Sequence, residues 1–425
     1  MFDLKKGHST QLTFIDLFAG AGGLSEGFIQ AGFEPVAHVE ADPAAAFTLR
    51  TREAYYRLKS MGLSSKYDDY LTGRLSRFDL YEVSGASTRV INATIGQEQL
   101  EKIFQHVDSL IGDCKPDLIV GGPPCQAYSL VGRARSDFKM VGDKRNYLFL
   151  YYVEFLKRYK PKYFVFENVV GLLSAREKEG RRYLDIMLSL FKDAGYSVEW
   201  KVLSAEKFGV PQKRKRVILV GKIGTDTGFF PDIVEVDADF LVRDAIGDLP
   251  SLRSGQGTPY ATSVTVKPSL WLRQAGILAA NKQITWHTAR PHNDRDLRIF
   301  REVVNRWIKH KERLSYDELP EKLKTHKNRT SFTDRFKVVA PDVSFSHTIV
   351  AHIAKDGNYY IHPDLAQNRS LTPREAARLQ TFPDDYFFES ASGQPSRTAA
   401  YKQIGNAVPV LLARRIAESI RRNWK

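Results

Sequence analysis

The sequence is poor in cysteine, with only Cys114 and Cys125 among its 425 residues. Two cysteines without paired spacing exclude a disulfide framework and a cysteine-rich zinc site, and they suit a reducing cytosol. Long apolar runs are also lacking, since none approaches the ~18 residues that a membrane span needs. The first residues are too few and too polar for a signal peptide. We therefore expect a soluble, cytoplasmic protein that has no membrane partner.

Acidic residues are in the minority. The chain has 49 Asp and Glu against 63 Lys and Arg, a formal net charge of +14, and its pI is about 9.5. This excess favours a polyanionic partner, with nucleic acid ahead of an anionic membrane. The chain is also long for a single hydrophobic core, which predicts two domains.

The stretch Gly121–Ser129 is the main candidate for chemistry. It reads GGPPCQAYS and follows the apolar run Asp117–Val120, which is typical of a short buried parallel strand. Two glycines allow a sharp turn, and two prolines stiffen the chain before Cys125. Open α/β sheets bind ligands at the carboxyl ends of their strands, where this thiol would lie. For this segment alone, a structural cysteine buried after a Pro-Pro turn is the alternative.

A strand, a glycine-rich turn and a helix follow one another near the start of the chain, at residues 14–18, 19–23 and 24–31. This order brings backbone N–H groups close to a nucleotide-like ligand. The next strand, 34–39, ends in Glu40, about 20 residues after the first glycine, where an acidic side chain can accept both hydroxyls of a ribose. The pattern fits a phosphate-free adenosyl ligand or a dinucleotide, and a simple tight turn is the alternative.

Polar residues adjoin two further predicted strands. The strand 163–166 leads into Glu167, which becomes a candidate general acid if its strand neighbours the one before Cys125. In Gln212–Arg216 the side chains of Gln212, Arg214 and Arg216 would share one face, because strand side chains alternate. Two arginines on that face could hold a carboxylate and a base carbonyl. Solvated surface charges are the alternative for both segments.

The remaining pattern predicts several helices and one insertion. Residues 50–90 are polar and tyrosine-rich, with a helical pattern near 51–60, and we interpret them as an insertion on the domain surface. Other expected elements are helices at 97–111, 147–157 and 183–194 and a strand at 197–203.

Residues 251–370 differ in composition from the rest. They hold 20 Lys and Arg against 11 Asp and Glu, which is +9 of the total +14, and seven of the ten histidines. The segment predicts a smaller, irregular domain that grips a phosphate backbone and reaches base edges. Its histidines are scattered without carboxylate or cysteine partners, so we expect no metal site.

A helix is predicted after this segment, over residues 371–380. Thr372 can cap it, with Pro373 at the first helical position and Glu375 completing a capping box. The chain then closes with a turn at 403–409 and an amphipathic helix at 411–421. Asn406 in that turn either meets a ligand or merely helps the chain to turn.

Taken together, these segments resemble the cytosine-C5 DNA methyltransferase family. Seven motifs have counterparts here in the family's order, spread over residues 13 to 420, which is far more specific than one Pro-Pro-Cys. They are the Asp16–Gly23 loop, Glu40, Gly122–Gln126, Glu167–Val169, Gln212–Arg216, the Arg374–Phe382 helix and the Gln403–Pro409 turn.

The resemblance implies an α/β fold, a Rossmann-like methyltransferase domain with a mostly parallel sheet. This domain would span residues 1–250, with the insertion at 50–90. A target-recognition domain would span 251–370, and residues 371–425 would return to the first domain. The family's adenine-contacting residues are hard to place, and Thr94–Gly96 is our best assignment for them.

The resemblance also implies roles for individual residues, with S-adenosylmethionine as the cofactor and double-stranded DNA as the substrate. The Cys125 thiolate would add to C6 of a flipped cytosine, so that C5 attacks the methyl group. The implied catalytic residues are Cys125, Glu167, Arg216 and Arg214. The implied cofactor residues are Asp16, Phe18, Ala19, Gly20, Gly22, Gly23, Leu24, Glu40, Pro123, Asn406 and Val408, and the implied base-contacting residues are Gln126, Ser129, Arg133, Asn168 and Gln212.

Three other functions fit parts of the pattern. A tRNA methyltransferase would share the catalytic motifs, although the large basic segment favours duplex DNA. A catalytically silent DNA-binding regulator would not need Cys125, Glu167 and Arg216. A dinucleotide-dependent oxidoreductase fits the first turn, but its glycine pattern is incomplete. A monomer of the restriction–modification type, acting beside a cognate endonuclease in a prokaryote, is our expectation.

Overall fold

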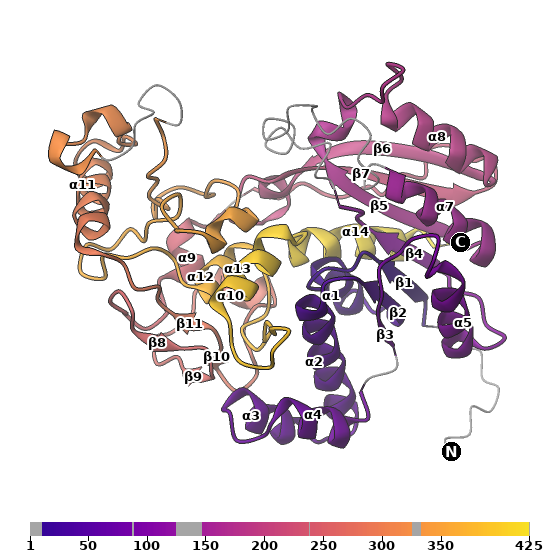
Figure 1. The fold of residues 1–425 in the computed structure, drawn as a ribbon, viewed down its shortest axis with the longest axis horizontal. Coiled ribbons are helices and arrows are strands. Elements are labelled where there is room, and N and C mark those ends of the chain that lie inside the picture. Colours follow the sequence, from indigo (N-terminus) through magenta and orange to yellow (C-terminus); the bar gives the residue numbers. More distant parts are fainter. Residues whose placement is uncertain (1–10, 87–88, 125–146, 238, 325–332, 425) are drawn as a thin grey trace.

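The structure is a computed structural model that describes residues 11–86, 89–124, 147–237, 239–324 and 333–424. Within these ranges the chain builds a seven-stranded sheet in the order β3-β2-β1-β4-β5-β7-β6 (Figure 1). All neighbouring strands are parallel except that β7 is antiparallel to both β5 and β6, which confirms the mostly parallel α/β sheet. The strands are β1 (Thr13–Leu17), β2 (Glu34–Glu40), β3 (Val90–Asn92), β4 (Leu118–Gly121), β5 (Tyr163–Val169), β6 (Tyr196–Ser204) and β7 (Lys215–Ile223).

Helices cover both faces of this sheet because the central strands are apolar on both sides. On one face Phe164 and Phe166 pack against α5 (Leu100–Ile111), α7 (Leu148–Tyr159) and α8 (Tyr183–Asp193). On the other face Val120 and Val165 join the core with α1 (Gly23–Gln30) and α14 (Val410–Arg422). The predicted helices in this part are confirmed, with boundaries that differ by up to three residues.

The C-terminal helix α14 packs against the first helix, α1. This close approach requires glycine at position 27, since a Cβ there would lie 2.5 Å from the Cβ of Ala413 and 2.6 Å from the carbonyl oxygen of Val410. In Figure 1 the yellow α14 runs alongside the indigo α1. Residues from the two ends of the chain therefore share one core.

The segment 50–90, which we expected to be an insertion on the domain surface, contributes several side chains to the large core. The predicted helix begins earlier, at Pro43, and α2 (Pro43–Ser60) continues into α3 (Ser64–Leu71) and α4 (Arg77–Ser84). Tyr67, Leu71 and Leu80 are buried. Tyr67 Oη donates to the carbonyl of Asp385 at 3.0 Å, so the C-terminal part of the chain covers the tyrosine-rich face.

Residues 251–370 are irregular, as predicted. They contain the short strands β8 (Gly257–Thr258), β9 (Thr262–Ser263), β10 (Gln283–Ile284) and β11 (His287–Thr288). One small apolar core gathers around the helix α11, including Phe300 and Val303. Trp271 and Trp286 instead belong to the large core shared with α1 and α14, so the division into domains stays a prediction. The other elements between β7 and the C-terminal part are α9 (Val242–Ile246), α10 (Leu270–Gln274) and α11 (Asp294–His310).

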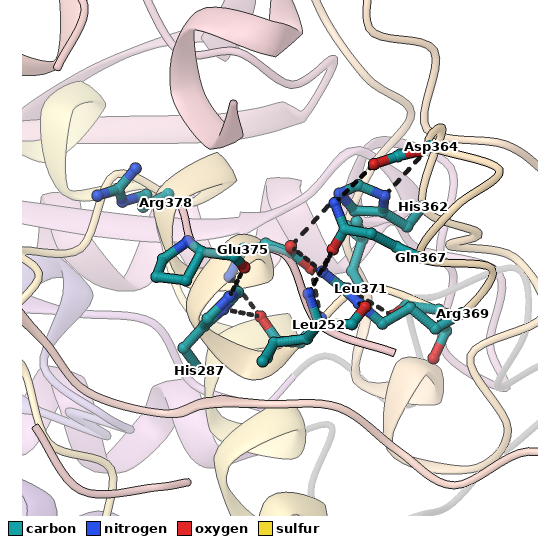
Figure 2. A network of polar contacts seen from close by, with 12 residues as sticks. Leu252, His287, His362, Asp364, Gln367, Arg369, Leu371, Glu375 and Arg378 are labelled. Carbon is teal, nitrogen blue, oxygen red and sulfur yellow. Dashed lines mark hydrogen bonds and ion pairs between the residues drawn. The ribbon is translucent and has the colours of Figure 1, made fainter. Parts of the chain in front are cut away.

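A buried polar network connects this region to α12 (Pro373–Leu379) (Figure 2). The capping box is confirmed: Thr372 accepts from the Glu375 backbone N–H, and the Glu375 carboxylate accepts from the Thr372 N–H at 2.7 Å. Arg369 donates to both oxygens of the same carboxylate at 2.7 Å, and His362 lies 3.5 Å from it. The carboxylate therefore caps the helix and neutralises Arg369, which is fully buried.

The segment 403–409 differs from the predicted turn. Gln403 to Asn406 form the end of α13 (Arg397–Asn406), and only the three residues 407–409 link it to α14. Short 3-10 turns occur at Val170–Leu173, Ala205–Phe208, Tyr316–Glu318, Glu321–Leu323 and Ala351–Ala354. No helix in the described ranges has the length and apolar character to cross a bilayer.

Candidate functional site

The predicted site residues in the described part of the chain gather at one edge of the sheet, where β1, β2, β4 and β5 end and β7 begins. These strands are neighbours in the sheet, so the polar residues that follow them come together although they are distant in sequence. The site has two halves, one around the turn after β1 and one between β4, β5 and β7.

The turn after β1 has an unusual backbone. Phe18, Gly20 and Gly22 all have positive φ angles, 57°, 55° and 81°. Two glycines adopt this conformation without strain, but Phe18 carries a side chain there, and such outliers gather at ligand sites. Two backbone hydrogen bonds hold the turn in place. The Gly22 N–H donates to the carbonyl of Ala19 at 2.9 Å, and the Ala19 N–H donates to the carbonyl of Val39 at 3.2 Å.

Glu40 closes this turn from the neighbouring strand. Its carboxylate accepts the backbone N–H groups of Gly20 and Asp42, each at 2.7 Å. Burial raises the pKa of Glu40, and these two hydrogen bonds lower it in part. The structure thus places Glu40 against the glycine turn, and its contact with a ribose stays a prediction.

Asp16 lies beneath the turn and is fully buried. One of its carboxylate oxygens accepts a hydrogen bond from Ser25 Oγ, and Ser25 Oγ lies 3.2 Å from Nδ1 of His38. The other oxygen, Oδ1, is buried without a hydrogen-bond partner among the described residues. A buried carboxylate oxygen of this kind favours a donor or a cationic group from a ligand.

The remaining residues of the first half line the glycine turn from two sides. Leu24, the second residue of α1, is buried in the large core. The carbonyl oxygen of Val408 lies so close to Gly23 that a Cβ on Gly23 would be 2.3 Å away. Asn406 is exposed at the end of α13.

Glu167 is the centre of the second half. It is the fifth residue of β5, whose Phe166 pairs with Gly121 at the end of β4. Its side chain is 13% exposed and fills the space beside Gly122, where a Cβ would lie 2.6 Å from Oε2. The turn that leads to Cys125 therefore passes directly over the Glu167 carboxylate.

Arg216 lies on β7, the strand next to β5, and forms an ion pair with this carboxylate. Its Nε lies 2.6 Å from Oε1 of Glu167, although Nε makes no well-aligned hydrogen bond with any residue that the structure describes. The contact is thus an ion pair in which the Nε–H does not point at the carboxylate. Both side chains are 13% exposed, so a ligand could reach either of them.

Arg214 and Gln212 have different contacts from the predicted ones. The Arg214 guanidinium donates to the carbonyls of Ile349 at 2.6 Å and Gly405 at 3.1 Å. The Gln212 amide donates to the carbonyl of Leu379 at 2.9 Å and accepts from the Ile349 N–H at 2.7 Å. Both side chains are buried and join segments far apart in the chain.

Asn168 is also turned inward. It is buried, and its Nδ2 donates to the carbonyl of Pro123 at 3.4 Å, which ties β5 to the turn after β4. Cys125, Gln126, Ser129 and Arg133 lie outside the described residues, so their predicted roles rest on the sequence alone.

Sequence reasoning missed several residues that shape the site. Ser25 and His38 hold Asp16, and Tyr386 Oη donates to the carbonyl of Ala21 at 2.6 Å. Position on the strand gives a partial signal for His38, which precedes Glu40 by two residues and shares its side of β2. Nothing in the local sequence points to Tyr386, because its partner is 365 residues away.

The geometry fits a small cationic ligand on the first half and a planar base on the second. A glycine turn with Glu40 offers backbone N–H groups and a carboxylate, as an adenosyl group requires. A carboxyl group paired with a guanidinium offers the hydrogen-bonding groups that a nucleobase edge requires.

Comparisons with known proteins point in one direction. A model of the family described as C-5 cytosine-specific DNA methylase matches residues 12–64 and 88–422. The chain is 40% identical to the type II methyltransferase M.Bpa9945I of Bacillus paralicheniformis, covering 96% of this chain and 98% of that protein. It is 30% identical to the type II methyltransferase M1.HphI of Haemophilus parahaemolyticus, with coverages of 96% and 86%.

Solved structures are similar in fold. A proposed DNA modification methyltransferase encoded within a prophage of E. coli has a TM-score of 0.60 and 21% identity, covering 97% of this chain and 99% of that chain. The S. pombe Dnmt2 methyltransferase has a TM-score of 0.52 and 15% identity, with coverages of 98% and 100%. At these identities the likeness concerns the fold alone.

Proposed function

The chain belongs to the C-5 cytosine-specific DNA methylase family, and on this premise we propose how its residues carry out the reaction. It is a DNA (cytosine-5-)-methyltransferase that uses S-adenosylmethionine, of the type II kind found in restriction–modification systems. The family match over nearly the whole chain carries this conclusion. The position of Glu167 and Arg216 beside the turn before Cys125 supports it.

The first half of the site is the proposed cofactor cradle. Glu40 would accept the ribose hydroxyls, and the backbone from Phe18 to Gly23 would surround the adenosyl group together with Leu24, Pro123, Asn406 and Val408. The buried, unpartnered Oδ1 of Asp16 suits a cofactor that is itself cationic. S-adenosylmethionine supplies an electrophilic methyl group on a sulfonium when it is bound.

The second half is the proposed base pocket. Glu167 would hydrogen-bond N3 of the cytosine and stabilise the charge that develops in the ring. Arg216 would hold O2 of the base and keep the Glu167 carboxylate in place. The Arg216 guanidinium lies 2.6 Å from the Glu167 carboxylate and also donates to the carbonyl of Lys215 at 2.8 Å, which supports this positioning role.

Cys125 is the proposed nucleophile. Its thiolate would add to C6 of the cytosine and form a carbon–sulfur bond, and the ring electrons would shift to C5. C5 takes up the methyl group, a base then removes the C5 proton, and the C6–S bond breaks to release the thiolate. Gln126, Ser129 and Arg133, which follow Cys125, remain the proposed contacts to the DNA around the flipped base.

Arg214, Gln212 and Asn168 are better proposed as positioning residues than as groups that touch the base. Arg214 fixes the start of β7, and therefore Arg216, to Ile349 and Gly405. Asn168 fixes the turn before Cys125 relative to β5.

The finer properties of the enzyme are proposals as well. The excess of positive charge in residues 251–370 supports their role as a target-recognition domain on duplex DNA. Because the curated relatives are type II methyltransferases, we also propose that a cognate restriction endonuclease is present in the same cell. We further propose that the enzyme is a monomer.

The test is transfer of labelled methyl from S-adenosylmethionine to mixed-sequence duplex DNA, followed by digestion to nucleosides. We expect label in 5-methylcytosine with the wild type and none with Cys125→Ala. Glu167→Gln should retain DNA binding and lose most of the activity. A tRNA substrate in a parallel reaction tests the alternative.

Other outcomes would contradict parts of the proposal. Label on adenine or on cytosine N4 would exclude attack at C6 by Cys125. Salt-sensitive DNA binding without any label would favour a silent regulator. Equal activity of Cys125→Ala and the wild type would remove the proposed nucleophile.

A further inference from the structure

The aromatic side chain of Phe345 is exposed, although the backbone around it is held by hydrogen bonds to the segment that leads to Arg216. Phe345 is 40% exposed, whereas its neighbour Ser346 is 4% exposed and Ile349 is fully buried. A large apolar side chain loses free energy when it stays in water. Single exposed apolar side chains are common on protein surfaces, so the surroundings of Phe345 decide whether it has a role.

The backbone under Phe345 is held to the segment that carries the catalytic arginine. The Ser346 N–H donates to the carbonyl of Pro211 at 3.0 Å, and the Lys213 N–H donates to the carbonyl of Ser346 at 2.9 Å. Thr348 Oγ1 donates to the carbonyl of Lys213. Phe345 is therefore presented on a fixed support and not on a free loop.

A lysine accompanies the ring. Lys213 Nζ lies 5.9 Å from the centroid of the Phe345 ring, and Lys213 and Lys215 are exposed. Neither lysine has an acidic partner within the part of the chain that the structure describes. We call Lys213 and Phe345 the Lys213–Phe345 ledge. A lysine beside an exposed aromatic ring is a combination that binds nucleic acid through phosphate and base stacking.

The ledge is near the reacting base. Lys213 precedes Arg216 by three residues, a distance of about 10 Å in extended chain, and Arg216 pairs with Glu167. A base pair step in duplex DNA is about 3.4 Å. If DNA whose cytosine occupies the Glu167 pocket extends along this part of the chain, the ledge lies within a few steps of the flipped nucleotide.

We propose that the Lys213–Phe345 ledge stabilises the DNA from which the target cytosine has been flipped, with Phe345 packing on the unstacked neighbour and Lys213 on its phosphate. This inference rests on the proposed function of the Glu167 pocket. Flipping a base breaks its stacking and pairing, and an apolar side chain at the opened step replaces the lost contacts. The ledge then lowers the free energy of the flipped state without touching the reacting atoms.

The experiment compares two duplexes that contain a mapped methylation site. In one the target cytosine is paired with guanine, and in the other it lies opposite an abasic position and is already unpaired. We expect Phe345→Ala to slow single-turnover methylation of the paired duplex about 10- to 100-fold. The same variant should stay within about threefold of the wild type on the abasic duplex, because that duplex needs little flipping.

Three further variants complete the design. Phe345→Trp should restore most of the rate on the paired duplex. Lys213→Ala should weaken binding to both duplexes and reduce the salt slope by about one. Phe78 is 75% exposed on α4, which lies far from β7 in Figure 1, and Phe78→Ala is the matched control that should behave as the wild type.

The outcomes separate the inference from the function on which it rests. Equal losses by Phe345→Ala on both duplexes, or no loss on either, would overturn the role of the ledge while the wild-type activity stands. Failure of the wild type to methylate either duplex would overturn the proposed function and the inference with it. A lowered thermal unfolding temperature of Phe345→Ala would reveal a folding defect. In that case the rate of Phe345→Trp on the paired duplex tests the role of the ring, and a rate as low as that of Phe345→Ala would contradict it.

Discussion

Acid should destabilise the protein through His362, and the size of the effect follows from its position in the network of Figure 2. His362 is buried among Glu375, Arg369, Asp364 and His287. Burial lowers its pKa from 6.5 to about 4, although Glu375 opposes the shift. The folded protein therefore holds this histidine neutral at pH values where the unfolded chain protonates it.

The sign and size of the effect follow from proton linkage. Between about pH 4 and pH 6.5 the unfolded chain binds more protons, so the free energy of unfolding falls as the pH falls. The full difference between 6.5 and 4 corresponds to about 3 kcal/mol, of which about 2 kcal/mol is lost between pH 7 and pH 5. The contribution of His362 to the free energy of unfolding is fully present above about pH 6.5, the pKa of this histidine in the unfolded chain.

The assay is urea unfolding of the wild type and of His362→Gln at pH 7 and pH 5. Glutamine does not titrate, so the variant should lose about 2 kcal/mol less between the two pH values than the wild type. Its stability at pH 7 is expected to be about 1 kcal/mol lower because a buried polar contact changes. The exposed His310 gives the control His310→Gln. Equal losses by His362→Gln and the wild type would refute the buried, neutral His362.

Three other predictions concern the cofactor cradle, the helix packing and the DNA surface. Glu40→Gln should weaken S-adenosylmethionine binding about tenfold or more in calorimetry, because a carboxylate that accepts the Gly20 N–H is replaced by a neutral amide; unchanged affinity would exclude Glu40 from the cradle. Gly27→Ala should destabilise the fold by about 1–3 kcal/mol in urea, since its Cβ would meet α14, whereas Gly96→Ala, with no atom within 4 Å, should be neutral. DNA affinity should fall by orders of magnitude between about 50 and 200 mM salt if ~6–10 phosphates are contacted, and a flat dependence would contradict the basic target-recognition domain.

The buried Arg214 illustrates what the sequence could indicate about the site and what it could not. Strand alternation correctly separated Gln212 and Arg214, which are buried, from Lys213 and Lys215, which are exposed. It could not show that Arg214 donates to Ile349 and Gly405, since these partners lie 135 and 191 residues away. The partners of Arg214 therefore come from the structure alone, and its supporting role stays a proposal.

The segment 50–90 shows the same limit of local patterns. Polar residues at high density are typical of a surface, but here their polar groups are used inside the protein. Thr51 Oγ1 donates to Glu389 at 2.6 Å, and Arg52 pairs with Glu26 and Asp385 at 2.7 and 3.0 Å. A buried polar group costs little when its partner is present, and the partner belongs to a distant part of the chain.

The sequence by itself determined the features that depend on neighbours within a few residues. The strand–turn–helix after β1, the capping box at Thr372 and the order of the seven motifs all follow from local hydrogen bonds, backbone preferences and hydrophobic period. Only the tertiary structure decided that β7 lies between β5 and β6, which brings Arg216 to Glu167, and that α14 packs on α1. These arrangements depend on burial of apolar surface and on polar partners more than 40 residues apart, and no local pattern encodes such pairings.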